Sequence, residues 1–334
     1  YITIKPAHHP FEIRRVCNPR KKQNLPAFEI REVNLFLRKN VTQPDGLIMG
    51  LHYVDFAVDS PDNFAYPPCG SRLHIGFGHY GYLRVEVPHY LVLMVRDAEE
   101  LGRVNGADYW DMVRNCLDQA AVPDDYLQPM NGDETWLLAS PVRELDSLLD
   151  NSWLLIASAE YGARLARKVG DRDRAARYGE IAYRARLALR NFTPVAYQPP
   201  WYAIGRGGDG SLDFSLCPEV YARGAILGVL PADDRYLVDG LVAAWRQLGF
   251  ERGLRTHARS ATISGGTPGY VLYAAADSRI CDGVFSRELA RRVLEFVSAT
   301  GCAWEYHDLY DPAWGGEKRR LWDSAVLLMG LTHT

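Results

Sequence analysis

Two carboxylate side chains stand beside aromatic residues at widely separated points of the chain. Glu134 lies in the segment NGDETW, directly after Asp133 and two residues before Trp136. Glu305 directly follows Trp304. Aromatic surroundings disfavour the charged form of a carboxyl group, so its pKa rises and it can donate a proton near neutral pH. Hydrolysis of a glycosidic bond needs one carboxyl group to protonate the leaving oxygen and a second to activate water. These residues therefore predict Glu134 as a general acid and Glu305 as a general base.

The residues around these carboxylates suit a carbohydrate substrate. Asp133 is expected to orient the acid loop or to bind a sugar hydroxyl group, and tryptophan rings offer flat surfaces on which sugars stack. A loop-rich region upstream, with histidines, an arginine and tyrosines, can supply further hydroxyl-binding groups. The predicted substrate-binding residues are Arg72, His74, Asp133, Trp136, Trp201, Trp304, His307 and Trp314, and Trp322 offers one more ring.

Each of these motifs has a plainer interpretation. Asp133 and Glu134 could be an acidic pair near the start of a helix, where the helix dipole favours negative charge. Asp308 and Asp311 are rival candidates for the base. His307 lies close to the proposed base, but no HExxH motif accompanies it, so no metal ligand is predicted. No cofactor is predicted either.

Helical periodicity dominates the sequence from about residue 85 onward. It is clearest in FSRELARRVLEFVSATG, where Ser286 can cap a helix, Leu289, Val293 and Phe296 fall on one face, and Gly301 stands where a helix commonly ends. Similar patterns occur in VEVPHYLVLMVRDAEELGRVNG, ADYWDMVRNCLDQAA, LDSLLDNSWLLIASAEYGARLARKVG, RDRAARYGEIAYRARLALRNF, PEVYARGAILGVL, DRYLVDGLVAAWRQLG, TPGYVLYAAADSRI and RRLWDSAVLLMGL.

The expected helices come in pairs. Short turns such as Val169–Asp173 alternate with long loops rich in glycine and aromatic residues, which predicts helical hairpins around a common centre with a site at one end. About nine to eleven helices are visible by their periodicity. The predicted fold is therefore all-α, an (α/α)6 barrel whose first hairpin is missing or obscured, in a single catalytic domain over residues 1–334. A helical solenoid also pairs its helices, but it would show a fixed repeat length.

Two segments resemble six-hairpin glycosidases. NGDETW, followed by LDNSW, resembles the acid motif of the maltose and kojibiose phosphorylase family. AWEYHDLYDPAWGGEKRRLWDSAVLL resembles the closing segment of glucoamylase-like enzymes, although Tyr306 stands where those enzymes carry Gln and Asn131-Gly132 stands where the phosphorylases carry Gly-Pro. The resemblance covers residues 130–155 and 300–331. It implies an (α/α)6 barrel, an inverting mechanism, Glu134 as the acid and Glu305 as the base.

Two other functions remain open. Phosphorylases of this superfamily replace the base with bound phosphate, and the backbone N–H groups of Ser264–Thr267 could hold that phosphate ahead of a helix. The same stretch is also an ordinary helix start with Pro268 in the first turn. Glu305 favours water as the nucleophile, so a hydrolase is expected before a phosphorylase. The other alternative is a non-catalytic helical scaffold that binds glycans or proteins.

The composition narrows the classes of partner that the chain is expected to bind. The chain has 334 residues, 47% of them apolar, and a formal net charge of -3, which leaves no basic surface for nucleic acid or an anionic membrane. No apolar run is long enough to span a membrane. The six cysteines are scattered and are expected as buried thiols in a reducing compartment, so a cytoplasmic location is favoured over secretion. Because the chain begins with Tyr1, we expect that an upstream segment has been removed. No pattern indicates an oligomeric state.

The segment GRGGDG, Gly205 to Gly210, is glycine-rich. Its spacing matches neither a P-loop nor a dinucleotide-binding motif. We expect it to form a flexible loop over the site.

Overall fold

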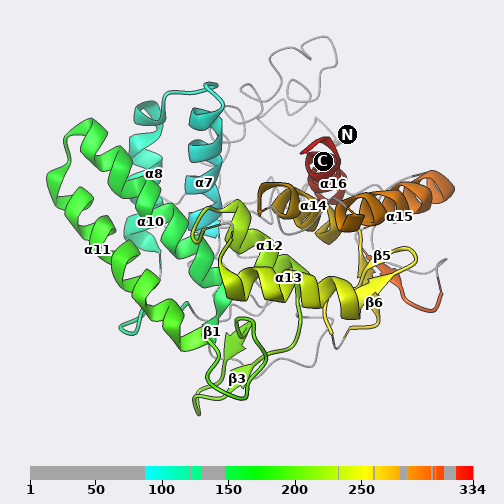
Figure 1. Cartoon of the computed structure of the whole chain (residues 1–334). Coiled ribbons are helices and arrows are strands. Elements are labelled where there is room, and N and C mark those ends of the chain that lie inside the picture. Colours follow the sequence, from blue (N-terminus) through cyan, green and yellow to red (C-terminus); the bar gives the residue numbers. More distant parts are fainter. Residues whose placement is uncertain are drawn as a thin grey trace, which may run out of the picture. The chain divides into compact units, whose positions relative to one another are not determined.

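Helices make up most of the part of the chain that the structure, a computed structural model, describes (Figure 1). This confirms the predicted all-α class. The described residues of Tyr1–Gly132 and Leu154–Leu187 form unit 1, and those of Asp133–Trp153 and Ala188–Thr334 form unit 2. The single domain over residues 1–334 and the closed barrel stay predictions. The described residues are 87–120, 122–128, 147–231, 233–258, 260–278, 284–301, 304, 306–311 and 321–333.

Unit 1 is built from helices that the periodicity predicted. Pro88 is the second residue of its first helix, where a missing backbone N–H costs no hydrogen bond. The apolar stripes of these helices are buried, with Leu91 and Val95 on the first helix, Val113 on the next and Tyr178 on the last. The elements are α7 (Val87–Glu100), the 3-10 helix η4 (Gly106–Tyr109), α8 (Trp110–Gln119), α10 (Leu149–Val169, in this unit from Leu154) and α11 (Arg172–Ala188).

Two carboxylates tie the helices of unit 1 together. Glu99 at the end of α7 accepts hydrogen bonds from the Tyr161 hydroxyl (2.9 Å) and the Lys168 ammonium (2.7 Å) of α10. Asp118 of α8 accepts from the Arg174 guanidinium (2.9 Å) and the Tyr178 hydroxyl (2.7 Å) of α11. Each carboxylate thus joins two elements that the chain visits far apart.

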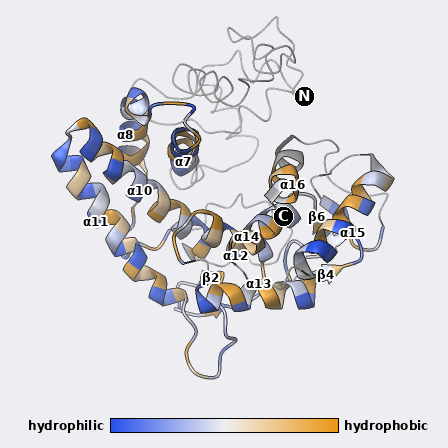
Figure 2. Ribbon diagram, turned by 45° about the horizontal axis from the view of Figure 1, so that its top comes forward, coloured by the Kyte–Doolittle hydropathy of each residue, from blue (hydrophilic) through white to orange (hydrophobic). Residues whose placement is uncertain are grey.

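The turn between α10 and α11 is as short as predicted. Gly170 has φ +83°, a left-handed conformation that glycine adopts without strain, and the Asp171 N–H donates to the Ala166 carbonyl oxygen (2.9 Å). The Asp171 side chain then accepts from the Arg174 N–H (3.1 Å) and caps the start of α11. Hydrophilic residues dominate the ribbon of α11 in Figure 2.

Unit 2 combines the start of α10 with the remaining helices and three small antiparallel sheets. Helix α12 packs on its neighbours α13 and α14, and α14 packs on α15 and α16. The helical elements are η5 (Leu189–Phe192), α12 (Pro218–Ile226), α13 (Arg235–Leu248), α14 (Thr267–Ser278), α15 (Val284–Thr300) and α16 (Leu321–His333). The strands pair in the orders β1 (Ser147–Leu148), β2 (Gly205–Arg206), β3 (Leu212–Asp213); β4 (Gly249–Phe250), β5 (Gly253–Leu254); and β6 (Thr262–Ser264), β7 (Tyr306–Asp308).

The structure corrects two local predictions in unit 2. Helix α15 begins at Val284, so Ser286 lies inside the helix and is not its cap, because the periodic pattern alone did not fix the first turn. Gly301, with φ +75°, does end this helix as predicted. The Gly205–Gly210 segment is not a loop throughout. It forms β2 and most of the turn of a hairpin, because the Gly207 N–H donates to the Ser211 carbonyl oxygen (2.9 Å) and Gly210 adopts φ +85°.

The segment NLPAFEIREVNLFLRKNV, Asn24 to Val41, has a helical pattern in the sequence and lies outside the described residues. Within the described ranges, no helix has the length and apolar content that a membrane-spanning segment needs.

Glycines allow α14 and α16 to approach each other at backbone distance. A Cβ atom built on Gly269 would lie 2.2 Å from the Val326 carbonyl oxygen, and one built on Gly330 would lie 2.3 Å from the Gly269 carbonyl oxygen. Both contacts are to backbone atoms, which cannot rotate away as a side chain can. The spacing of these two helices therefore depends on both glycines.

Replacing Gly269 by alanine should push α14 and α16 apart and lower the free energy of unfolding by about 1 to 3 kcal/mol. The matched control is Gly179→Ala in α11, where a Cβ would meet no atom within 4 Å. That substitution should raise the free energy of unfolding by about 0.5 to 1 kcal/mol, because alanine favours a helix. Urea denaturation followed by circular dichroism measures both. Equal effects of the two substitutions would contradict the close contact.

Buried His89 should make stability depend on pH. Its ring is fully buried, Nδ1 lies 2.7 Å from the Ser158 hydroxyl oxygen, and burial lowers the pKa of His89 from 6.5 to about 3. The unfolded chain therefore binds a proton below pH 6.5 while the folded chain does not. The free energy of unfolding should fall as pH falls from 6.5 towards 4, by up to about 1.4 kcal/mol per pH unit from this site. His89→Gln should flatten this slope in urea denaturation at pH 7, 6 and 5, and an unchanged slope would exclude His89 as its source.

Candidate functional site

The first turns of three helices in unit 2 meet in a buried charged cluster. Asp150 is the second residue of α10, Glu219 the second of α12 and Thr267 the first of α14. Arg223 Nη1 lies 2.7 Å from Asp150 Oδ2, and Arg223 Nη2 lies 2.6 Å from Glu219 Oε1. The Thr267 hydroxyl donates to Glu219 Oε2 over 2.8 Å. We call these residues, with Tyr270, the helix-start cluster.

Burial makes the electrostatics of this cluster strong. The exposed fractions of Asp150, Glu219 and Arg223 are 1%, 9% and 8%. One guanidinium is shared by two carboxylates, and the N-terminal ends of the helices contribute partial positive charge that favours the remaining negative charge. The Arg223 guanidinium lies 5.3 Å from the centre of the Tyr270 ring. Burial raises the pKa of Tyr270 well above its ordinary value, so its hydroxyl stays protonated.

The local sequence explains how the cluster forms. Pro218 starts α12, and Glu219 lies in its first turn. Arg223 is four residues after Glu219, a spacing that brings the two side chains together on one helix face. The sequence prediction missed this cluster. The available signal was a Glu–Arg pair at this spacing inside PEVYARGAI, where the surrounding residues are apolar and buried.

The strand pair β6–β7 places a second segment beside the start of α14. Ser264 pairs with Tyr306, and Thr262 pairs with Asp308. A Cβ atom on Gly265 would lie 1.5 Å from the Trp304 carbonyl oxygen, so only glycine fits there. The residues that flank Glu305 in the sequence are thus fixed against the Ser264–Thr267 stretch.

Most of the predicted site residues lie outside the described residues. This applies to both proposed catalytic residues, and nothing in the described geometry tests their roles. The residues outside are Arg72, His74, Asp133, Glu134, Trp136, Glu305 and Trp314, as well as the side chain of Trp322.

Three predicted substrate-binding residues are described. Trp201 is partly exposed, and its indole N–H donates to the Phe214 carbonyl oxygen (3.0 Å). Trp304 and His307 are brought together, with ring centres 4.7 Å apart, and both are buried. Their contact with a sugar stays a prediction.

His307 is held in its neutral form. Burial, together with the positive charge of Arg252, lowers the pKa of His307 from 6.5 to about 4. The Arg252 guanidinium donates to the Leu309 carbonyl oxygen on the far side of β7. A cavity of about 10 Å³, roughly the space of one water molecule, is lined by both Arg252 and His307. Arg252 therefore anchors the residue that directly follows β7.

The rival base Asp308 has a structural function in its own turn. Its Oδ1 accepts hydrogen bonds from the N–H groups of Tyr310 and Asp311, both over 2.8 Å. These two hydrogen bonds lower the pKa of Asp308 and keep its carboxylate ionised. Among the described residues, no group of three or more His, Cys, Asp or Glu side chains is arranged to hold a metal ion.

Replacing Arg223 by methionine should remove the guanidinium that Asp150 and Glu219 share. We expect the free energy of unfolding at pH 7 to fall by about 3 to 5 kcal/mol, because breaking a buried ion pair leaves buried charge behind. Urea denaturation of the variant and of the unmodified protein at pH 7, followed by circular dichroism, measures this.

Arg235→Met provides the control for that substitution. Arg235 is 79% exposed and lies 3.6 Å from Asp239, an exposed ion pair that contributes little. Its loss should change the free energy of unfolding by less than about 0.5 kcal/mol. If Arg223→Met cost no more than Arg235→Met, the helix-start cluster would not stabilise unit 2.

Comparison with known proteins gives a likeness in fold alone. The sequence matches no protein-family profile and no curated protein sequence. Solved structures do match, among them a metal-independent α-mannosidase from Streptococcus pneumoniae in a non-productive complex with α-1,6-mannobiose. The TM-score is 0.56 at 12% sequence identity, and the alignment covers 75% of this chain and 68% of the mannosidase chain. The described chain therefore has a fold similar to that of a helical glycosidase.

Proposed function

We propose that this protein is a glycoside hydrolase that cleaves a glycosidic bond with inversion. The observation that carries the proposal is the fold similarity to the α-mannosidase, at a TM-score of 0.56. It is supported by the acid motif around Glu134 and by the aromatic segment around Glu305, which the sequence places before α10 and before β7.

The proposed reaction uses two carboxyl groups. Glu134 donates its proton to the glycosidic oxygen as the bond to the leaving sugar breaks. Glu305 removes a proton from a water molecule, which attacks the anomeric carbon from the opposite face. Proton donation and water attack on opposite faces invert the anomeric configuration.

The helix-start cluster supports a common location for the two proposed catalytic segments. The chain that carries Glu134 leads into α10, and the pairing of β7 with β6 fixes the residues on both sides of Glu305 against the start of α14. Asp150, Glu219 and Arg223 join the starts of α10 and α12, and Thr267 adds the start of α14. Both proposed catalytic segments therefore adjoin helices that one network holds together.

The cluster also favours a hydrolase over a phosphorylase. A phosphorylase would bind phosphate at the N–H groups of Ser264–Thr267. At this position the Glu219 carboxylate already accepts a hydrogen bond from the Thr267 hydroxyl (2.8 Å). The negative charge of Glu219 opposes a phosphate dianion. Water is therefore the proposed nucleophile.

The first substrate to test is α-1,6-mannobiose, the sugar bound to the similar mannosidase. Glu134→Gln and Glu305→Gln should each lower kcat/KM by about 100- to 10,000-fold, because each removes one step of proton transfer. Proton NMR of the first product should show the inverted anomer, and a chelator should leave the rate unchanged. Glu160→Gln, which alters an exposed ion pair with Arg186, is the control and should keep full activity.

Three results would contradict parts of the proposal. A retained anomeric configuration would exclude the inverting mechanism. Cleavage that requires inorganic phosphate and releases a sugar phosphate would establish a phosphorylase. Sugar binding that survives in both variants, without turnover of any glycoside by the unmodified protein, would indicate a scaffold.

A further inference from the structure

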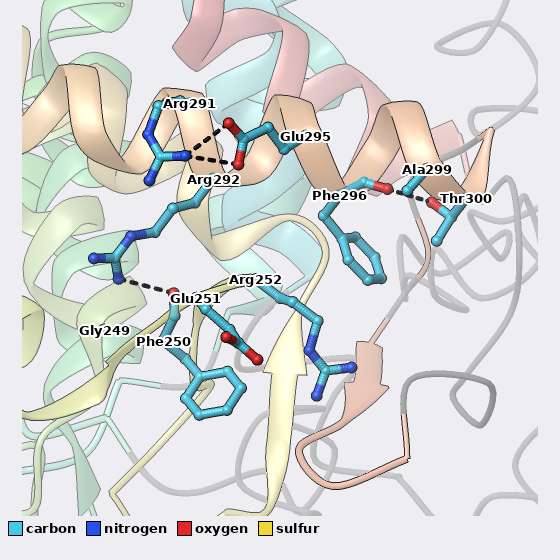
Figure 3. Close-up of a pocket in the computed structure, with 10 residues that line it drawn as sticks. All are labelled: Gly249, Phe250, Glu251, Arg252, Arg291, Arg292, Glu295, Phe296, Ala299 and Thr300. Carbon is cyan, nitrogen blue, oxygen red and sulfur yellow. Dashed lines mark hydrogen bonds and ion pairs between the residues drawn. The ribbon is translucent and has the colours of Figure 1, made fainter.

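A groove runs between the β4–β5 hairpin and one face of α15 in unit 2 (Figure 3). Its volume is about 740 Å³. Ligand sites in proteins commonly measure roughly 300 to 1,000 Å³. We call it the hairpin groove. One wall is the segment Gly249–Arg252, and the other is formed on α15 by Arg291, Arg292, Glu295, Phe296, Ala299 and Thr300.

The hairpin presents its side chains to the groove in a fixed geometry. Phe250 pairs with Gly253, so Glu251 and Arg252 form the two-residue turn between β4 and β5. Gly253 has φ +139°, a conformation that residues with a side chain rarely adopt. The Arg252 guanidinium lies 5.6 Å from the centre of the Phe250 ring. The turn is therefore a defined structure with an aromatic ring beside it.

Ion pairs hold the arginines of the opposite wall in place. Arg291 Nη1 lies 2.7 Å from Glu295 Oε1, and Arg291 Nη2 lies 2.8 Å from Glu288 Oε1. Arg292 donates to Glu288 (2.7 Å) and, across the groove, to the Phe250 carbonyl oxygen (2.9 Å). Because these side chains are already ordered, a ligand that binds them pays little conformational entropy.

The charges of the groove balance. The groove is lined by three arginines and two glutamates: Arg252, Arg291, Arg292, Glu251 and Glu295. A third glutamate, Glu288, forms ion pairs with Arg291 and Arg292. Three positive and three negative groups leave no net field to attract a polyanion or a polycation. They do leave many hydrogen-bond donors and acceptors at fixed positions.

Two features remain available to a ligand. Glu251 is exposed and makes no hydrogen bond or ion pair with other described residues, and Figure 3 shows its carboxylate between the Phe250 ring and the Arg252 guanidinium. The rings of Phe250 and Phe296 are both partly exposed. Hydroxyl groups can donate to the carboxylate, and a sugar face can stack on a ring.

We propose that the hairpin groove is an accessory site for a neutral oligosaccharide. This inference rests on the proposed glycosidase function and adds a second place at which its substrate is held. Phe296 lines the groove and also packs against His307, with ring centres 4.1 Å apart. His307 belongs to β7, the strand that follows Glu305. A long sugar chain bound in the groove is therefore kept beside the segment that carries the proposed base.

The test separates binding of long chains from cleavage of short ones. Isothermal titration of the Glu134→Gln protein with α-1,6-mannohexaose gives the Kd, and turnover of α-1,6-mannobiose by the otherwise unmodified protein gives kcat/KM. Adding Phe250→Ala should raise the Kd for the hexaose about tenfold, and adding Glu251→Ala about fivefold. Neither change should alter kcat/KM for the disaccharide. Leu294→Ala is the control, because Leu294 is exposed on α15 but does not line the groove.

Several outcomes would overturn the accessory site. An unchanged Kd in both groove variants would place the oligosaccharide elsewhere. An equal loss of disaccharide turnover would make the groove part of the catalytic site. Binding of heparin or polylysine in preference to neutral hexaoses of mannose, glucose or galactose would contradict the argument from charge balance.

One further outcome separates the two proposals. If no glycoside is cleaved but a neutral hexaose binds and both groove variants weaken it, the accessory site stands and the proposed hydrolysis fails.

Discussion

The buried guanidinium of Arg223 is the interaction on which the rest of unit 2 depends. It is shared by Asp150 of α10 and Glu219 of α12, and Glu219 extends the network to Thr267 at the start of α14. A buried charge is costly unless all its partners are in place, so such a network tolerates few alternative arrangements. It therefore selects one position of the three helix starts relative to one another. The segments that precede these helices end at that fixed position, and the proposed acid Glu134 belongs to the segment before α10.

Close backbone contacts at two glycines position further segments beside α14. Gly265 lies against the Trp304 carbonyl oxygen, and Gly269 lies against α16. The first contact brings the residue before Glu305 to the start of α14, and the second brings α16 to α14 itself. Charge fixes the position of the helix starts, and the absence of a side chain lets the neighbouring segments reach them.

The parts of the structure that were predictable are those determined by nearby residues. The periodicity of apolar residues identified α7, α10 and α15, and the glycine at 301 identified the end of α15. The helix-start cluster was not found, because Asp150 and Arg223 lie far apart in the sequence and neither looks unusual alone. The predicted start of α15 and the loop predicted at the β2–β3 hairpin were wrong for a related reason. Capping residues and glycine-rich stretches have several local solutions, and tertiary contacts select among them.

Burial decides what the same residue types do at two places in unit 2. In the helix-start cluster, Arg223 and its carboxylates are almost inaccessible, so their charges position helices and do not meet a ligand. In the hairpin groove, Arg291 and Glu295 form a comparable pair at the surface, where ion pairs add little stability. Exposed pairs that do not stabilise the fold remain useful as ordered donors and acceptors. Because their charges cancel, the proposed accessory site would discriminate by the geometry of hydrogen bonds, which suits uncharged sugars with many hydroxyl groups.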